Sequence, residues 1–148
     1  PGVHMNDTYK RLDRAEAATM ERRQRMNATE RLLELVEYLS PSDRALLEAV
    51  YHRGMKPTEL ARAINARPRM IRSRVQRIVQ RLNSPLFKFV SGHRADWPRL
   101  RREVGELIVL KGTSQRDTAA KLGVSLHRVR QEMVCLREQS RLMRNTSW

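Results

Sequence analysis

The chain has 148 residues and a mass of 17.4 kDa, enough for one ordinary domain or two very small ones. Hydrophobic residues make up 40% and charged residues 31%, a balance typical of a globular rather than a disordered protein. The 30 Lys and Arg against 16 Asp and Glu give a net charge of +14, which indicates a polyanionic partner and favours nucleic acid over a membrane surface. We expect neither a membrane span nor a secretory signal, since no apolar run approaches the roughly 18 residues of a span. The single cysteine, Cys135, excludes an internal disulfide.

The positive charge is concentrated in the middle of the sequence. Residues 1–61 are neutral, whereas residues 62–102 carry a net charge of +11 and residues 111–148 a net charge of +5. A uniformly basic surface would serve solubility, but a concentrated basic stretch is what a nucleic-acid-binding surface requires. The alternative interpretation is a solvated basic helix face without a partner.

The N-terminal third is predicted to be helical. Residues 1–5 are interpreted as an expression scar and left out of the predicted fold. Residues 6–40 form the predicted N-terminal helical segment, which is rich in the good helix formers Ala, Glu, Arg and Met. Asn27, with Glu30 three residues later, matches a capping pattern and predicts that a new helix opens there.

Residues 41–83 are predicted to form a unit of three helices. The sequence Ser40-Pro41-Ser42-Asp43 combines a capping serine, a proline at the first helical position and an acid in the first turn. It predicts a helix that ends before Gly54. Pro57 and Pro68 predict the starts of two further helices, the second of which carries its apolar residues at helical spacing.

Residues 84–97 are predicted to be a linker, because Ser-Pro and Ser-Gly pairs interrupt them. Their apolar run, Leu86–Val90, fits either a short strand or an apolar plug. Residues 98–138 are predicted to form a second unit, whose first helix runs from Pro98 to about residue 110. Residues 139–148 are the predicted C-terminal tail. No pattern demands a sheet, so the predicted fold class is all-α.

A shift of 58 residues aligns the second unit with the first without a gap. The paired positions share apolar or small character: Gly54 with Gly112, Ala61 with Ala119, Ile64 with Leu122, Ile71 with Val129, Arg72 with Arg130, Val75 with Met133 and Ile78 with Leu136. Gly123 supplies the positive φ that a tight turn needs, and Asn65 at the equivalent place is the best substitute for glycine. The pattern predicts tandem trihelical helix-turn-helix units preceded by N-terminal helices.

At this point a family resemblance is apparent. Leu39–Leu82, with Thr58-Glu59-Leu60-Ala61 and Ile71–Arg77, resembles region 4 of bacterial RNA polymerase sigma factors. Gly112–Leu136, with Ala119–Ser125, is similar to the same class and to LuxR-type regulators. The resemblance implies a helix-turn-helix that contacts the −35 promoter element and the polymerase β-flap. RNA polymerase is therefore an expected partner besides double-stranded DNA.

The outward face of the predicted helix 68–82 carries Arg, Ser and Gln and no acid. Such side chains read base edges in the major groove, since Arg pairs with guanine, Gln with adenine and Ser with either. The predicted base-reading residues of this helix are Arg69, Arg72, Ser73, Gln76 and Arg77. The predicted phosphate contacts, which position a protein without specifying sequence, are Arg62, Arg67, Arg74 and Arg81.

The second copy presents a more mixed face. Its predicted base-reading residues are His127, Arg130 and Gln131, and Arg128 is its predicted phosphate contact. The outward Val134 fits contact with a thymine methyl or with protein, and the acids of this helix would repel phosphates if they faced them. Base contact is one role for this copy, and dimerisation or polymerase contact is the other.

No nucleotide-binding glycine loop and no nucleophile motif occurs, so we expect neither an enzyme nor a cofactor or metal site. The leading prediction is a cytoplasmic, nucleoid-associated transcription regulator that binds specific double-stranded DNA and reads the major groove with helix 68–82. A homodimer held by the N-terminal helices is one expected assembly. The alternatives are a protein-interaction module that binds RNA polymerase or a sigma factor, and an RNA-binding protein.

Overall fold

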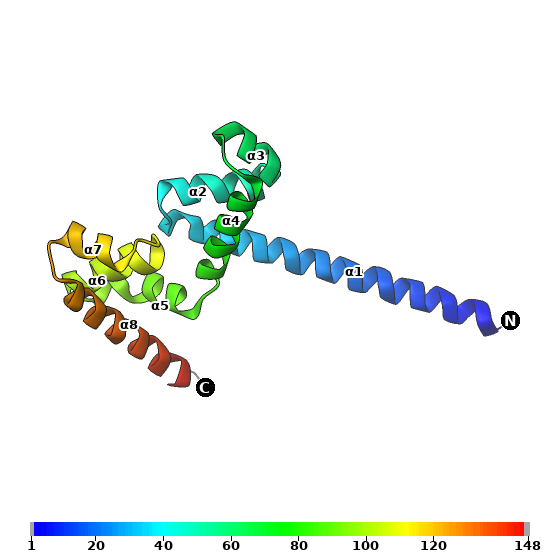
Figure 1. Ribbon diagram of the computed structural model, residues 1–148. Helices are drawn as coiled ribbons and strands as arrows, with labels where there is room; N and C mark the ends of the chain where they lie inside the picture. The colour runs from blue at the N-terminus through cyan, green and yellow to red at the C-terminus, as the bar shows by residue number, and fades with distance from the viewer. Residues whose placement is uncertain (1, 147–148) are drawn as a thin grey trace. The chain divides into compact units, whose positions relative to one another are not determined.

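A computed structural model describes residues 2–146, and these residues are helical with no strand among them (Figure 1). The predicted all-α fold class is therefore confirmed. The chain divides into two compact units, Pro1–Glu34 and Leu35–Trp148. None of the described helices combines the length and the apolar composition needed to cross a membrane.

The first unit is the long helix α1 (Gly2–Leu35), which continues without a break through Asn27. The prediction that a new helix opens at Asn27 is therefore wrong. No proline or glycine follows Gly2 in this helix, and one Asn among good helix formers costs only about 0.5 kcal/mol. The backbone is helical from Gly2 onward, so most of the predicted expression scar continues α1, while Pro1 lies outside the described residues.

The second unit is a series of short helices followed by one long one. In chain order its elements are η1 (Val36–Tyr38), α2 (Pro41–Leu47), η2 (Glu48–His52), α3 (Pro57–Ile64), α4 (Pro68–Leu82), α5 (Pro85–His93), η3 (Arg94–Asp96), α6 (Arg99–Val104), η4 (Gly105–Leu110), α7 (Gln115–Leu122) and α8 (Leu126–Thr146). The elements η1 and η3 are single 3₁₀ turns, and η2 and η4 are π-helical turns that continue α2 and α6.

The predicted helix starts around residues 41, 57 and 68 are confirmed, and so is the cap of the first of them. The Ser40 side chain accepts a hydrogen bond from the backbone N–H of Asp43, which satisfies one of the free donors at the start of α2. Pro57 and Pro68 stand at the first positions of α3 and α4. The local sequence therefore sets these boundaries.

The stretch predicted to be a linker is instead the helix α5 followed by η3. Ser84 caps α5 through the N–H of Phe87, and Pro85 stands at its first position. Phe87 and Val90, three residues apart, are fully buried on one face of this helix. The apolar run is therefore not a strand, and of the two predicted alternatives its burial fits the apolar plug, since α5 packs against η4 and α8.

The predicted C-terminal tail is also helical, because α8 continues to Thr146. Ser140, in the predicted tail, is buried within the unit. Residues 147–148 lie outside the described residues. The long helix thus carries both the predicted second-copy residues and most of the predicted tail.

The shift of 58 residues that aligns the sequence also relates the backbone of the two parts of this unit, which we call the first half (residues 35–82) and the second half (residues 93–140). It maps η1 onto η3 and the π turn at the end of α2 onto the one at the end of α6. Three backbone hydrogen bonds of the first half recur at equivalent positions of the second. Arg53 N donates to Glu48 O as Lys111 N does to Glu106 O, both at 3.0 Å, and Met55 N donates to Ala49 O at 3.0 Å as Thr113 N does to Leu107 O at 2.8 Å. Ala66 N donates to Ala61 O at 2.8 Å, and Val124 N donates to Ala119 O at 3.1 Å. The repeat therefore extends upstream of the aligned sequence motifs.

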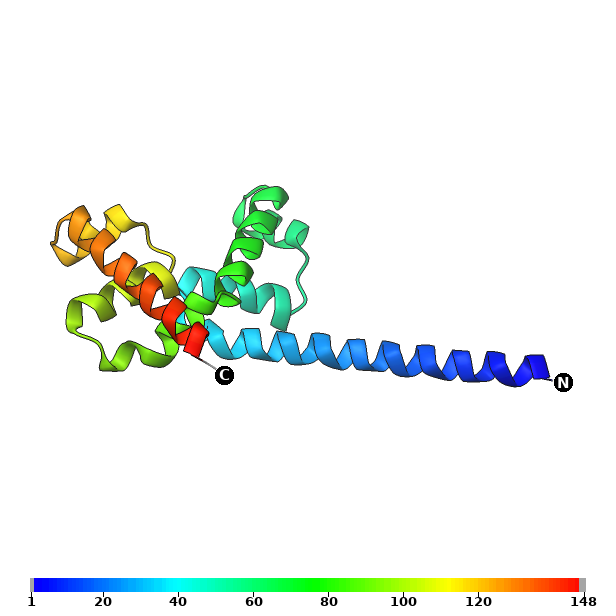
Figure 2. The same cartoon turned by 90° about the horizontal axis from the view of Figure 1, so that it is seen from below.

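Each half ends in a pair of helices joined by a tight turn. Asn65, between α3 and α4, has φ 54°, and Gly123, between α7 and α8, has φ 65°. Ala61 and Ala119, at equivalent places in the shorter helix of each pair, are buried against the longer helix. Figures 1 and 2 show the two helix pairs on different sides of the second unit.

Two further glycines at equivalent positions, Gly54 and Gly112, both adopt positive φ, at 66° and 72°. Their surroundings differ. A Cβ atom on Gly54 would meet nothing within 4 Å, whereas one on Gly112 would collide with the guanidinium of Arg81. The second half therefore needs glycine at this turn for two reasons, the backbone conformation and the space that Arg81 occupies.

We predict that Gly112→Ala lowers the free energy of unfolding more than Gly54→Ala does. Both variants place an L side chain in the left-handed region, which costs about 1–2 kcal/mol. Only Gly112→Ala also displaces Arg81, which adds about 1.5–3 kcal/mol if its charged hydrogen bond is lost. Urea unfolding of the two variants and the parent chain measures the difference. Equal destabilisation by the two changes would contradict the close approach of Arg81.

Candidate nucleic-acid interface

Helix α4 is the most cationic element of the second unit. Its 15 residues include five arginines and no acid. The buried face of the helix carries Ile71, Ile78 and Leu82, and the helix also packs against α3. Its other faces are therefore held in place while they remain open to solvent.

The five predicted base-reading residues of α4 are all exposed. They form two rows along the helix. Arg69, Ser73 and Arg77 line a shallow hollow beside the α3–α4 turn. Arg72 and Gln76 line another hollow, beside η2 and the start of α3. When such a helix lies in the major groove, each row can contact base edges on its own side of the helix axis.

Two exposed apolar side chains stand next to the first row and were not among the predicted site residues. Ile64 is 58% exposed and Met70 is 62% exposed, and both line the hollow that holds Arg69 and Arg77. Apolar side chains in this position can contact the methyl group of thymine. One signal for Met70 is present in the sequence, since it directly precedes the core residue Ile71 and cannot share its face.

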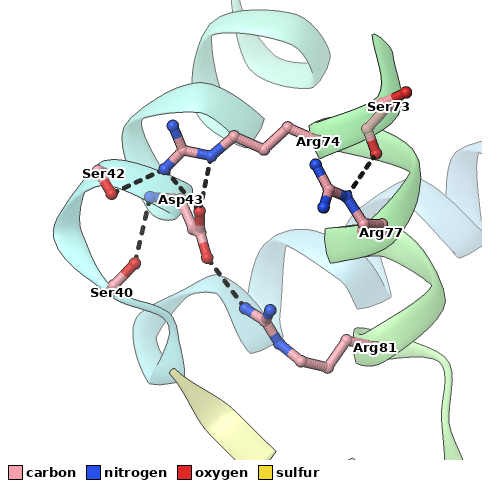
Figure 3. A network of polar contacts seen from close by, with 7 residues as sticks. All are labelled: Ser40, Ser42, Asp43, Ser73, Arg74, Arg77 and Arg81. Atoms are coloured by element: carbon pink, nitrogen blue, oxygen red, sulfur yellow. Dashed lines mark hydrogen bonds and ion pairs between the residues drawn. The ribbon is translucent and has the colours of Figure 1, made fainter. Parts of the chain in front are cut away.

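A carboxylate clamp joins α2 to α4 (Figure 3). The Asp43 Oδ1 atom accepts hydrogen bonds from Arg74 Nη2 at 2.9 Å and from Arg74 Nε at 3.2 Å. Its Oδ2 atom accepts a hydrogen bond from Arg81 Nη2 at 3.0 Å. Arg74 also donates to the Ser42 hydroxyl at 2.9 Å. One acid on α2 therefore holds two arginines that lie two turns apart on α4.

The electrostatics of the clamp favour the ionised carboxylate. Burial by itself raises the pKa of Asp43, whose residue is only 8% exposed. The hydrogen bonds and positive charges of Arg74 and Arg81 together outweigh that effect and hold the pKa below its usual value of 3.8. Because two guanidinium groups face one carboxylate, the clamp retains one net positive charge.

Arg81 is the more enclosed of the two arginines in the clamp, with a side chain 23% exposed against 44% for Arg74. Its guanidinium lies over Gly112 of the second half while it binds Asp43 of the first half. Its Nε atom is buried and has no hydrogen-bond partner in the part of the chain that the structure describes. Arg81 therefore bridges the two halves at the cost of one unsatisfied donor.

The structure separates the four predicted phosphate contacts of the first copy into two groups. Arg62 at the end of α3 and Arg67 at the cap of α4 are exposed. Arg74 and Arg81 instead have an internal partner in Asp43. The sequence alone did not reveal this, because Asp43 lies 31 and 38 residues before them. We therefore exclude Arg74 and Arg81 from the phosphate contacts proposed below.

In the second half the predicted residues gather around one hollow on α8. His127, Arg130, Gln131 and Arg128 are exposed and line it together with Val134. Val134 is 64% exposed. The structure thus brings these residues together, as the shared face of one helix requires.

The acid of this hollow is neutralised from within the fold. Glu132 accepts a hydrogen bond from Arg101 Nε on α6 at 2.9 Å, and Arg128 Nη2 lies 4.0 Å from its other oxygen. This bond raises the pKa of Arg101 further above its usual range. Glu132 therefore lines the hollow but is only 9% exposed, and Arg101 and Arg128 balance its charge.

No three His, Cys, Asp or Glu side chains come together in a metal-binding arrangement within residues 2–146. Comparison with protein-family models, with curated proteins and with solved structures found no match to this chain. Function must therefore be inferred from the charge and geometry of the interface.

We predict that Asp43→Asn lowers the free energy of unfolding by about 1–3 kcal/mol at neutral pH, because it leaves two partly enclosed guanidiniums without their acceptor charge. The lowered pKa of Asp43 means that its stabilisation is fully present above about 3.8 and disappears as the pH falls through the still lower pKa of the folded state. The difference between parent and variant should therefore shrink below pH 4.

Urea unfolding from neutral pH to about pH 2.5 tests this prediction. Asp96→Asn, at an exposed carboxylate in η3, makes the same chemical change and serves as the control. A pH-independent difference between Asp43→Asn and the parent chain would show that the clamp carboxylate does not carry the stabilisation.

Proposed function

We propose that this protein binds double-stranded DNA and regulates transcription, with α4 as the helix that enters the major groove. The observation that carries the proposal is the exposed face of α4, where Arg69, Arg72 and Arg77 stand with Ser73 and Gln76 and no acid interrupts them. Asp43, the acid that pairs with arginines of α4, is buried within the clamp. A helix with its side chains has the width that the major groove of DNA admits.

In this proposal each half of the second unit is a helix-turn-helix, with α3–α4 and α7–α8 as the helix pairs. The left-handed residues Asn65 and Gly123 in the turns and the buried alanines opposite them support that assignment. The resemblance of the sequence to region 4 of sigma factors agrees with it and makes RNA polymerase a partner to be tested.

The contacts fall into two classes. The two rows on α4 would read base edges, and Ile64 and Met70 would add preference for thymine. Arg62 and Arg67, which flank the start of α4, would bind phosphates and fix the position of the helix on the duplex. The positive charge left over at the clamp adds attraction without a direct contact.

The second half has two candidate roles. His127, Arg130, Gln131 and Arg128 favour a second DNA contact, in an adjacent groove. The exposure of Val134 in the middle of the same face favours a protein partner instead. From residue 126 to 140, α8 carries two acids among its basic residues, whereas α4 carries none, so we assign the principal DNA contact to α4.

We predict that Arg72→Ala combined with Arg77→Ala weakens binding to duplex DNA by at least about tenfold, since each arginine that meets a guanine contributes about 1–3 kcal/mol. Helicity and melting temperature should change little, because both side chains are exposed. Fluorescence anisotropy with a labelled duplex, at fixed moderate salt, measures the affinity.

The matched control is Arg22→Ala combined with Arg23→Ala, which removes the same charge from exposed positions of α1. A larger loss in the α4 variant than in the control supports the assignment of the face. Equal losses would show that only overall charge matters, and unchanged affinity of the α4 variant would contradict the proposal.

A further inference from the structure

The clamp has a counterpart in the second half with its charges exchanged. In the first half, Asp43 on α2 binds Arg74 on α4 at 2.9 Å, and in the second half Arg101 on α6 binds Glu132 on α8, also at 2.9 Å. The partners are 31 residues apart in both pairs. The shift of 58 residues places Asp43 on Arg101 and Arg74 on Glu132, so each position keeps a charge but reverses its sign.

The buried apolar residues of the two long helices differ much less between the halves than these charged residues do. Ile71 and Val129 occupy equivalent buried positions, as do Ile78 and Leu136. Either helix could therefore bury an aliphatic residue at each of these two positions in the other half. The exception lies at the end of the helix, where fully buried Leu82 corresponds to Ser140.

Exchange of the two helices would bring like charges together. Helix α4 packed on α6 would place Arg74 against Arg101, and α8 packed on α2 would place Glu132 against Asp43. Both acids are at most 9% exposed, so water would screen the contact of Glu132 with Asp43 poorly. Each like-charge contact is expected to disfavour the exchanged arrangement by roughly tenfold or more.

We propose that this reversed ion pair is a pairing code, which makes the docking surface of each half accept its own long helix and reject the other. The rejected partners are the wrong helix of the same chain and the wrong helix of a second copy. A chain built from two similar halves needs such discrimination, since helices that match in shape exchange readily during folding or between copies. This role does not depend on DNA binding.

The direct test gives both halves the same polarity in the full chain. Arg101→Glu and Glu132→Arg are each expected to lower the melting temperature as single changes, because each places two like charges in contact. The two changes together restore attraction and should recover most of the loss. The double variant should nevertheless refold to both arrangements, because Arg74 on α4 now meets an acid on α6, and the arginine that replaces Glu132 on α8 now meets Asp43 on α2.

Refolding from urea, followed by size-exclusion chromatography with light scattering, measures the outcome. We expect the double variant to form at least about tenfold more of larger, exchanged species than the parent chain at the same concentration. Arg99→Glu with Glu103→Arg, at a pair on α6 whose arginine is 83% exposed, exchanges charges without touching the code and is the control.

A milder variant, Arg101→Gln with Glu132→Gln, removes the discrimination without introducing repulsion and keeps the test valid if the charge-exchanged chain does not fold. It too should yield more exchanged species than the control. Refolding of both variants to the parent's species in the parent's yield would overturn the proposal. So would single variants that melt at the parent's temperature, because the pair would then not contribute to helix docking.

Discussion

The carboxylate of Asp43 is the constraint on which the rest of the second unit depends. It lies at the start of α2, fixed by the Ser40 cap, and it holds Arg74 and Arg81, which lie two turns apart on α4. An apolar core fixes how closely two helices approach, whereas directed charge-assisted bonds also fix their rotation about their own axes. Because Arg81 lies over Gly112, the same carboxylate also ties the first half to the second.

The rotation of α4 about its own axis decides which of its side chains face the solvent. With Arg74 and Arg81 turned toward α2, the remaining faces carry Arg69, Arg72, Ser73, Gln76 and Arg77, and the acid that pairs with α4, Asp43, is enclosed. The second half reaches a similar arrangement with the opposite polarity, since Arg101 on α6 encloses Glu132 of α8. Both halves therefore remove an acid from the surface, and each engages arginine within the fold to do so, two in the first half and Arg101 in the second.

Much of the fold was predictable, because its signals are local. Capping serines and prolines gave the starts of α2, α3 and α4, and the small residues of the turns revealed the repeat. The errors have physical causes. Asn27 has a capping side chain but no helix breaker beside it, and the apolar run of α5 shows its helical face only through its packing. The exposed candidates on α4 follow from helical periodicity. The partners of Arg74 and Arg101 do not, since each lies 31 residues away and only the tertiary fold brings them together.

The most direct test of the account is an anisotropy titration of the parent chain with random duplex DNA, duplex RNA and single-stranded DNA over a range of salt concentrations. A cationic helix that docks in the major groove predicts the tightest binding to duplex DNA, because A-form RNA has a major groove too deep and narrow for side chains to read. It also predicts that the logarithm of the affinity falls linearly with the logarithm of the salt concentration, as phosphate contacts release counterions. Equal affinity for the three nucleic acids, or no binding at moderate salt, would contradict the assignment of α4 as a DNA-reading helix.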